Sequence, residues 1–292
     1  MFITNIFFVF SLLLTSLISH SPEGNPNVTG YNLKQPDKTM VLPEILREIS
    51  GLTDIDNSTI ACIQDEKGII FIYDIISNKI NKEYNFYTDG DYEEISLVDH
   101  TAYILRSDGV ILEIPNYTVK DFKVKNYPTG IPANNNEGLC YDEAKHRLLV
   151  SSKTKIRKDH ELKDMRFIYA FDLKTKTLAS EPVYSFDVQA IKKFANDKDG
   201  NVHAGSKKKG EAGDIKFLPS AIALHPITKD LYLISAVDHL LFVFEDGSLK
   251  HIEKLDHKIF NQPEGITFLK NGDMLISNEG QTATLLRFNY LK

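Results

Sequence analysis

Short apolar runs recur along this chain of 292 residues with a fixed period. Each period opens with a Ser or Glu, continues through a small or acidic residue to a Leu or Ile, and passes into an apolar run that ends at a turn. The opening tripeptides are Ser50-Gly51-Leu52, Glu93-Glu94-Ile95, Glu137-Gly138-Leu139, Ser220-Ala221-Ile222 and Glu264-Gly265-Ile266. They follow one another at 43 or 44 residues, with one interval of 83. A period in the forties that holds several short strands is typical of a β-propeller.

The apolar runs within one period predict a blade of four antiparallel strands. In the first period the runs cover 50–55, 58–64, 69–73 and 80–86, and turn residues separate them. The second period repeats this arrangement and contains Asp108-Gly109, a dipeptide favoured in two-residue hairpin turns. Each period therefore corresponds to one blade.

The long interval before the fourth period predicts an insertion rather than a further blade. All four strands of the third blade are accounted for by Asp187, and 188–219 lacks the apolar runs that four more strands require. We therefore expect five blades and an insertion at 188–219. The position of the insertion directly before the inner strand at Ser220 would let it lie over the mouth of the channel as a lid, but the sequence does not determine what it covers.

The fifth period yields only three apolar runs before the chain ends at Lys292. A strand at 31–34, within a linker at 22–40, would supply the fourth, pair with the last strand and leave no open sheet edge. The predicted fold is all-β, a five-bladed β-propeller of four-stranded antiparallel blades over 41–292. An N-terminal strand joins the last blade and closes the ring.

The first 21 residues contain no Asp, Glu, Lys or Arg, and 6–18 form an apolar run of thirteen. At about 1.5 Å per residue, such a helix is shorter than the roughly 30 Å hydrocarbon core of a membrane. Residues 1–21 are typical of a signal peptide, with an uncleaved N-terminal anchor as the alternative. Either interpretation predicts an extracytoplasmic protein, which is periplasmic, secreted, or anchored in the plasma membrane through this segment.

The charge and the cysteines exclude two further classes of protein. The formal net charge of −6 argues against a nucleic acid partner, because phosphate backbones select basic surfaces. The two cysteines, Cys62 and Cys140, lie inside apolar runs of different blades, so we expect buried free thiols and no disulfide framework.

Three of the period-opening residues are glutamates, Glu93, Glu137 and Glu264, at the start of inner strands. We expect them to converge from three blades on one mouth of the channel. Carboxylates that meet in a confined site repel one another unless they take up protons or a cation lies between them. Oxygen ligands of this kind suit Ca²⁺, which is the predicted cofactor. The alternative is that each carboxylate accepts backbone hydrogen bonds from the neighbouring blade.

Further polar residues are expected at the same rim. Asn278 and Glu279 follow the second strand of the last blade, which returns to this rim, and are further candidate metal ligands. Ser50 and Ser220 open the two periods that lack a glutamate and belong to a predicted ligand rim. Arg106 and Lys153 follow second strands and either bind an anionic ligand or balance the carboxylates.

Four stretches together resemble one known family. They are NNNEGLCYD at 134–142, PSAIALHPITKDLYLIS at 219–235, KLDHKIFNQPEGITF at 254–268 and ISNEGQTATLLRFNY at 276–290. In combination these stretches are similar to the SdiA-regulated (YjiK-like) family of bacterial envelope proteins, distantly similar to NHL-repeat propellers. The resemblance implies a five-bladed propeller with a bound calcium ion and no established activity. The chain departs from the family pattern at Glu94, where a Gly is expected.

Two functions are consistent with these features. The first is an exported, non-catalytic calcium-binding propeller that binds a protein or small-molecule ligand at its acidic channel mouth. It rests on the apolar leader, on the three glutamates and on the absence of a serine nucleophile elbow, a P-loop or a dinucleotide-binding motif. The alternative is a divalent-metal-dependent hydrolase or lactonase-like enzyme, in which the ion polarises a carbonyl group. We assign no catalytic residue from the sequence.

Overall fold

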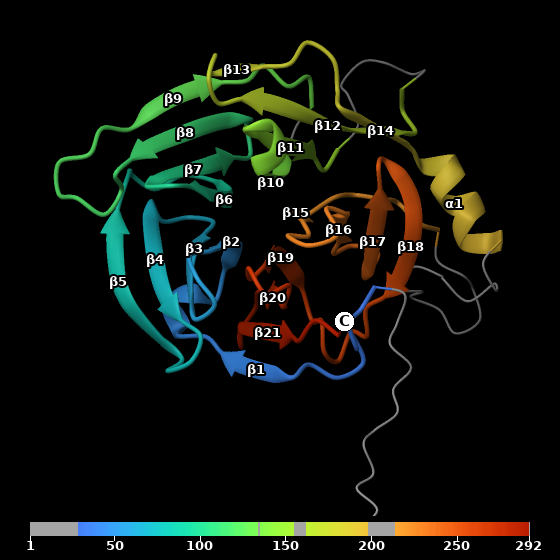
Figure 1. Cartoon of the computed structure of the whole chain (residues 1–292), viewed down its shortest axis with the longest axis horizontal. Helices are drawn as coiled ribbons and strands as arrows, with labels where there is room; N and C mark the ends of the chain where they lie inside the picture. The colour runs from blue at the N-terminus through green and yellow to red at the C-terminus, as the bar shows by residue number, and fades with distance from the viewer. Residues whose placement is uncertain (1–28, 134, 155–161, 198–213, 292) are drawn as a thin grey trace, which may run out of the picture.

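The computed structural model describes residues 29–133, 135–154, 162–197 and 214–291 (Figure 1). Five antiparallel sheets are arranged around a central axis, so the predicted five-bladed β-propeller is confirmed. The predicted leader at 1–21 lies outside the described residues. Among the residues that the structure describes, no helix is long and apolar enough to cross a membrane.

The blades follow the chain in order, and each begins with the strand nearest the axis. Blade 1 contains β2 (Ile49–Asp54), β3 (Thr59–Gln64), β4 (Ile69–Asp74) and β5 (Lys79–Asn85). Blade 2 contains β6 (Tyr92–Val98), β7 (Thr101–Arg106), β8 (Val110–Pro115) and β9 (Lys125–Pro128). Blade 3 contains β10 (Asn136–Asp142), β11 (Arg147–Ser152), β12 (Met165–Asp172), β13 (Thr177–Leu178) and β14 (Tyr184–Asp187). Its outer edge is divided, because β13 and β14 pair with different ends of β12.

The last two blades complete the ring. Blade 4 contains β15 (Ala221–Leu224), β16 (Leu231–Ser235), β17 (Leu240–Glu245) and β18 (Ser248–Lys254). Blade 5 contains β19 (Pro263–Phe268), β20 (Met274–Asn278), β21 (Thr284–Phe288) and the N-terminal β1 (Lys38–Val41). Two short 3-10 helices, η1 (Glu44–Leu46) and η2 (Glu143–Lys145), precede β2 and β11.

An N-terminal strand does close the ring, but its predicted position was wrong. The closing strand is β1, which pairs with β21 from Lys38 opposite Arg287 to Val41 opposite Thr284. Residues 31–34 instead form a bend and turn, and the side chains of Tyr31 and Leu33 are buried in the cluster between blades 4 and 5. The apolar residues at 31 and 33 therefore anchor the segment that leads into the closing strand.

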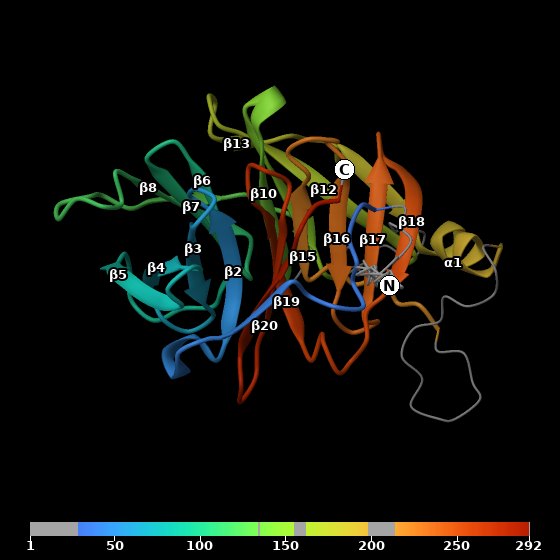
Figure 2. The same cartoon turned by 60° about the horizontal axis from the view of Figure 1, so that its bottom comes forward.

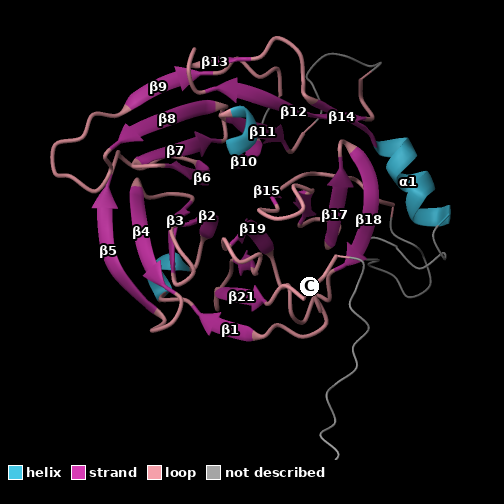
Figure 3. Ribbon diagram, in the orientation of Figure 1, coloured by secondary structure: helices cyan, strands magenta, loops and turns pink. Residues whose placement is uncertain are grey.

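The insertion after blade 3 begins with α1 (Val188–Asp197), a helix that the strand-based interpretation missed. Val188, Ile191 and Ala195 lie on one side of this helix and pack in the hydrophobic cluster between blades 3 and 4. The helix α1 lies at the outer edge of the disc (Figures 2 and 3). Residues 198–213 lie outside the described ranges.

The core of the molecule lies between the blades. Each pair of adjacent blades encloses one cluster of buried apolar side chains among the described residues. Both faces of a blade are therefore buried, which explains why its strands are nearly continuous apolar runs. Cys62 and Cys140 lie in two of these clusters as free, buried thiols, as predicted.

Candidate cation site at the channel mouth

Each period-opening glutamate is the extra residue of a β-bulge. In β6 the pairing passes from Tyr92 opposite Arg106 to Glu94 opposite Leu105, so that Glu93 has no partner of its own. The same shift in register leaves Glu137 in β10 and Glu264 in β19 without a paired residue on the neighbouring strand. A bulge bends the strand and re-aims a side chain, which is why bulges are common at the rims of barrels and next to functional sites. In blades 1, 2, 3 and 5 the repeat in the sequence thus marks a bulge at the start of the inner strand, whereas β15 of blade 4 pairs without one.

The residue after the bulge is packed against the next blade. A Cβ atom on Gly265 would lie 2.3 Å from Cδ2 of Leu52 and 2.6 Å from Oγ of Ser277. A Cβ atom on Gly138 would lie 2.4 Å from Oγ of Ser151. Glycine at these two positions lets neighbouring inner strands approach closely and keeps the bulges in a narrow ring.

The three predicted glutamates lie within electrostatic range of one another. Burial, together with the nearby Glu137, Asp91 and Glu264, raises the pKa of Glu93 to about 8, while Lys153 opposes the increase. Burial likewise raises the pKa of Glu264 to about 7, with Lys153 lowering it and Glu137 raising it. Carboxyls from blades 2, 3 and 5 thus share one electrostatic environment at the mouth.

Lys153 is the cation within this group. Its Nζ lies 2.7 Å from Oε2 of Glu137, and the side chains of both residues are largely buried. Burial alone would lower the pKa of Lys153, but Glu137, Glu264 and Glu93 together raise it. The interpretation of Lys153 as a counter-charge, rather than as a free anion-binding group, therefore agrees with its position.

Glu279 belongs to the acidic mouth on the side of blades 5 and 1. Its N–H donates to the Gln262 carbonyl at 3.0 Å, and the side-chain amide of Gln262 donates to its carboxylate. Burial raises the pKa of Glu279 to about 7, and Glu264, Asp65 and Glu48 add to the increase. Sequence reasoning did not propose Asp65, although it occupies the place in blade 1 that Glu279 occupies in blade 5, directly after the second strand.

Asn278 has a structural role in the described residues. Its side-chain nitrogen donates to the Ile259 carbonyl at 3.1 Å and to Oγ1 of Thr284 at 3.0 Å, which fastens the loop before β19 to the strand β21. The side-chain oxygen Oδ1 of Asn278 is buried without a hydrogen-bond partner, so this atom stays a candidate ligand.

The two predicted rim serines hold neighbouring blades together. Ser50 Oγ donates to the Tyr92 carbonyl of blade 2 at 2.9 Å. Ser220 Oγ lies 3.3 Å from the Ile234 carbonyl and 3.5 Å from the Pro263 carbonyl of blade 5. Both side chains are buried, so the structure does not present them at a ligand rim.

Arg106 is engaged within its own hairpin. Its guanidinium forms an ion pair and a hydrogen bond with Asp108, in the turn between β7 and β8. The side chain of Arg106 remains about one third exposed, at 32%. An anionic ligand at this position would have to compete with Asp108.

Glu94 is the polar residue of this region whose role the sequence did not reveal. Its Oε1 accepts hydrogen bonds from the Leu52 N–H of blade 1 at 2.9 Å and from the Ile95 N–H at 3.0 Å, and Oε2 is buried without a partner. Burial raises the pKa of Glu94 well above its usual value. A Cβ on Gly51 would lie 2.4 Å from this Oε1, so Glu94 fills space that a glycine in blade 1 leaves open. The contact with the backbone of the neighbouring blade, which was the alternative role for Glu93, Glu137 and Glu264, is made by Glu94.

The donor set at the mouth fits a hard cation. The candidate ligands are carboxylate oxygens together with buried oxygens that lack hydrogen-bond partners, among them Oδ1 of Asp65, Oδ1 of Asn278 and the hydroxyls of Ser151 and Ser277. Such oxygens suit Ca²⁺ and do not select zinc. Across the described ranges, no three His, Cys, Asp or Glu side chains are arranged to hold a metal ion as they stand. A divalent ion would have to draw the carboxylates inward.

Comparison with known proteins supports the fold and no particular family. No protein-family model matches the chain, and no curated protein sequence does. Glutaminyl cyclase from Myxococcus xanthus aligns with a TM-score of 0.58 at 9% identity, over 87% of this chain and 95% of its own. A chain of the mitotic checkpoint complex gives a TM-score of 0.51 at 10% identity, over 98% of this chain and 99% of its own.

A third solved structure is less similar. Virginiamycin B lyase from Staphylococcus aureus aligns with a TM-score of 0.44 at 14% identity, over 86% of this chain and 73% of its own. Identities this low show a shared fold alone. The chain is a five-bladed β-propeller in which acidic side chains from several blades lie within electrostatic range of one another at the starts of the inner strands.

Proposed function

We propose that the protein is an exported, non-catalytic β-propeller that binds Ca²⁺ at its acidic channel mouth and binds a protein or small-molecule ligand there. The observation that carries this proposal is the clustering of Glu93, Glu264 and Glu279, whose pKa values are raised to between about 7 and 8. Their pKa values lie near 7 because burial and mutual repulsion disfavour the charged carboxylates. A bound cation would stabilise the charged forms against both effects.

The residues that would hold the ion are Glu264 and Glu279, with Glu93 and Glu137 on the far side of the mouth. When bound, Ca²⁺ would neutralise the carboxylates and draw them toward one centre. Its preference for six to eight oxygen ligands leaves room for water or for an oxygen of a ligand. The resemblance to SdiA-regulated envelope proteins supports calcium as the ion. The charge-free leader at 1–21, outside the described residues, supports export.

Thermal unfolding of the purified chain tests the ion. Ca²⁺ at a hundredfold excess over its Kd should stabilise the protein by about 2.7 kcal/mol relative to EGTA, and so raise Tm. Glu264→Gln should abolish the increase, whereas Glu83→Gln, an exposed acid on β5, should preserve it. An equal Tm with and without Ca²⁺ in the wild-type protein would reject the calcium proposal.

A second candidate function is a divalent-metal-dependent hydrolase or lactonase-like enzyme. The observation in its favour is Glu93, whose carboxyl has a pKa of about 8 and lies near Lys153 at a channel mouth. A carboxyl that titrates near neutrality is suited to general acid–base catalysis. A panel of lactones and phosphoesters, assayed with and without EDTA, tests this function. Turnover that EDTA and Glu93→Gln each remove would favour the enzyme over the binding protein.

A further inference from the structure

Two exposed apolar side chains lie at the end of the propeller opposite the mouth. Ile227 follows the inner strand β15 and is 47% exposed, and Leu291 follows β21 and is 46% exposed. Both strands run away from the mouth, because β15 and β19 begin there and β21 runs parallel to β19. The two turns touch, since a Cβ on Gly272 would lie 3.0 Å from Cδ1 of Ile227 and 2.9 Å from Cδ1 of the partly exposed Tyr290. Ile227, Tyr290 and Leu291 therefore form one small apolar surface, the basal patch.

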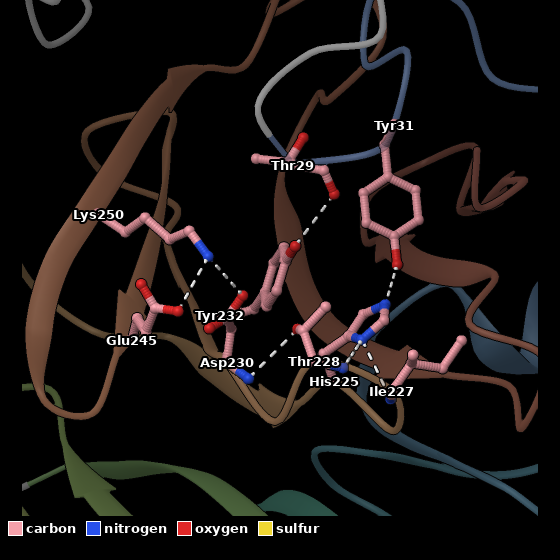
Figure 4. Close-up of polar contacts among 9 residues, drawn as sticks. All are labelled: Thr29, Tyr31, His225, Ile227, Thr228, Asp230, Tyr232, Glu245 and Lys250. Carbon is pink, nitrogen blue, oxygen red and sulfur yellow. Dashed lines mark hydrogen bonds and ion pairs between the residues drawn. The ribbon is translucent and has the colours of Figure 1, made fainter. Parts of the chain in front are cut away.

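The chain enters the described part of the structure beside the basal patch. The Leu291 N–H donates to the Gly30 carbonyl at 2.9 Å, and a Cβ on Gly30 would lie 2.6 Å from Cε2 of Tyr290. The Tyr232 hydroxyl donates to the Thr29 carbonyl at 3.3 Å (Figure 4). The predicted leader is therefore attached at the basal patch and not at the mouth.

The length of chain before Thr29 limits how far this end can lie from anything that holds the leader. The chain from Ile18, the last residue of the apolar run, to Thr29 spans at most about 40 Å when fully extended. A helix of thirteen residues is about 20 Å long and does not cross a hydrocarbon core of roughly 30 Å. A marginal anchor of this kind holds a protein stably only with a second membrane contact. Because the tether raises the effective concentration of the basal patch at the membrane, a small surface is sufficient for that contact.

The charges around the basal patch fit an anionic membrane surface. Lys229 and Lys270 are exposed in the two turns that carry the patch. Long lysine side chains keep their ammonium groups at the headgroups while apolar neighbours lie deeper. Asp246, in the outer turn of blade 4, is exposed. Other acidic side chains at this end of blades 4 and 5 are engaged with the protein itself: Asp230 and Glu245 with Lys250, Asp273 with Arg287, and Asp37 with the Asn289 N–H.

We propose that this end of the propeller docks on a lipid bilayer with anionic headgroups while the leader holds the chain to the same membrane. The basal patch lies at the boundary between headgroups and acyl chains, and Lys229 and Lys270 lie among the headgroups. The acidic mouth, at the other end of the inner strands, then faces away from the membrane and is open to ligands from the aqueous side. This orientation is independent of what the mouth binds.

The depth of a fluorophore in the bilayer tests the orientation. The native Cys62 and Cys140 are buried, so a cysteine introduced at the surface can be labelled selectively. Ile227→Cys and Val237→Cys are matched, because the two side chains are 47% and 46% exposed and lie at opposite ends of β16. The full chain with its leader is synthesised in vitro with vesicles of phosphatidylcholine and phosphatidylglycerol, in EGTA.

Quenching by nitroxide-labelled lipid is the measured quantity. Interfacial apolar groups lie about 5–10 Å into the headgroup boundary, so the label at Ile227→Cys should be quenched about twofold or more. The label at Val237→Cys should be unquenched. Equal quenching at the two positions, stronger quenching at Val237→Cys, or no association with the vesicles would overturn the proposal.

Charge substitution in the basal patch separates docking from attachment by the leader alone. With the fluorophore at Leu291→Cys, Ile227→Asp and Lys229→Glu should each remove about half of the quenching or more, because both weaken contact with an anionic bilayer. Val237→Asp should leave the quenching unchanged. All three substitutions are at exposed positions, so the fold should be retained. Equal quenching in Ile227→Asp and Val237→Asp would show that the leader alone holds the protein and would overturn the docking surface.

Discussion

The Tyr31 hydroxyl lies 2.8 Å from Nε2 of His225, although 194 residues separate the two in the chain (Figure 4). Nδ1 of His225 accepts hydrogen bonds from the N–H groups of Ile227 at 3.2 Å and Thr228 at 3.0 Å, so the ring proton lies on Nε2. Nε2–H therefore donates to the Tyr31 oxygen, and the Tyr31 O–H donates to the Gly272 carbonyl at 2.6 Å. This relay fastens the segment before the closing strand between blades 4 and 5.

Removal of the Tyr31 hydroxyl should destabilise the ring closure. Tyr31→Phe keeps the buried ring but leaves the His225 N–H and the Gly272 carbonyl unpaired, which should cost about 1–3 kcal/mol in urea unfolding. Tyr87→Phe, at a side chain that is 46% exposed, is the matched control and should cost less than about 0.5 kcal/mol. Equal stability of Tyr31→Phe and the wild type would show that the relay does not hold the N-terminal segment.

Protonation of His225 should contribute to acid destabilisation. Burial lowers the pKa of His225 to about 4 from the ordinary value near 6.5, and the side chain is fully buried. Between these values the unfolded chain binds a proton that the folded protein does not. The stability from His225 is therefore present above pH 6.5 and is lost as the pH falls toward 4, by about 3 kcal/mol at most. His225→Gln should lose less stability than the wild type between pH 6.5 and 4. A parallel pH profile for the two proteins would contradict this.

The mouth acids should have the opposite pH dependence. The folded pKa of Glu93, about 8, is above the unfolded value, so its contribution to stability is fully present below about pH 4.5 and is lost as the pH rises through 8. Glu93→Gln removes the buried charge and should be more stable than the wild type at pH 8.5 in EGTA, on the order of 1–3 kcal/mol. The two proteins should be nearly equal at pH 4.5. Guanidinium unfolding at both pH values measures this difference in stability. A lower stability of Glu93→Gln than of the wild type at pH 8.5 would contradict the claim that the Glu93 carboxylate is buried among other acids.

Glu94 should tolerate a neutral isostere and not a truncation. Because burial disfavours the charged form of the Glu94 carboxyl, the neutral Glu94→Gln variant, which retains the acceptor for the Leu52 and Ile95 N–H groups, should change stability by less than about 1 kcal/mol. Glu94→Ala leaves both donors unpaired and opens a cavity, at a cost of about 2–5 kcal/mol. Chemical unfolding of the two variants compares these costs. A larger loss of stability in Glu94→Gln than in Glu94→Ala would mean that the charged carboxylate is the form that accepts the hydrogen bonds from Leu52 and Ile95.

The number of blades could be predicted because it is encoded locally. A bulge at Ser50, Glu93, Glu137 and Glu264 requires the same short pattern wherever an inner strand begins. That requirement produces a period that is visible without coordinates. The helix α1 was missed because only three of its residues are fully buried in the cluster between blades 3 and 4, and such spacing in a charged segment is hard to distinguish from a loop.

The candidate site was predictable only in part. The positions of Glu93, Glu137 and Glu264 follow from the period, and that of Glu279 follows from the return of the second strand to the same rim. The inter-blade bonds of Ser50 and Ser220, and the direction of Asn278, depend on contacts with other strands that no local pattern specifies. The ion pair between Lys153 and Glu137 likewise depends on the conformation of the long lysine side chain, which no local pattern specifies.

The sequence by itself determined the repeat, the blade count and the acidic residues at the bulges of blades 2, 3 and 5, because all of these depend on neighbours within one period. Only the tertiary structure decided which strand closes the ring, where Tyr31 is anchored and which carboxylates share the mouth with Lys153. Those relationships join residues from different blades, and their energies depend on burial and on distance through space. A linear pattern contains neither quantity.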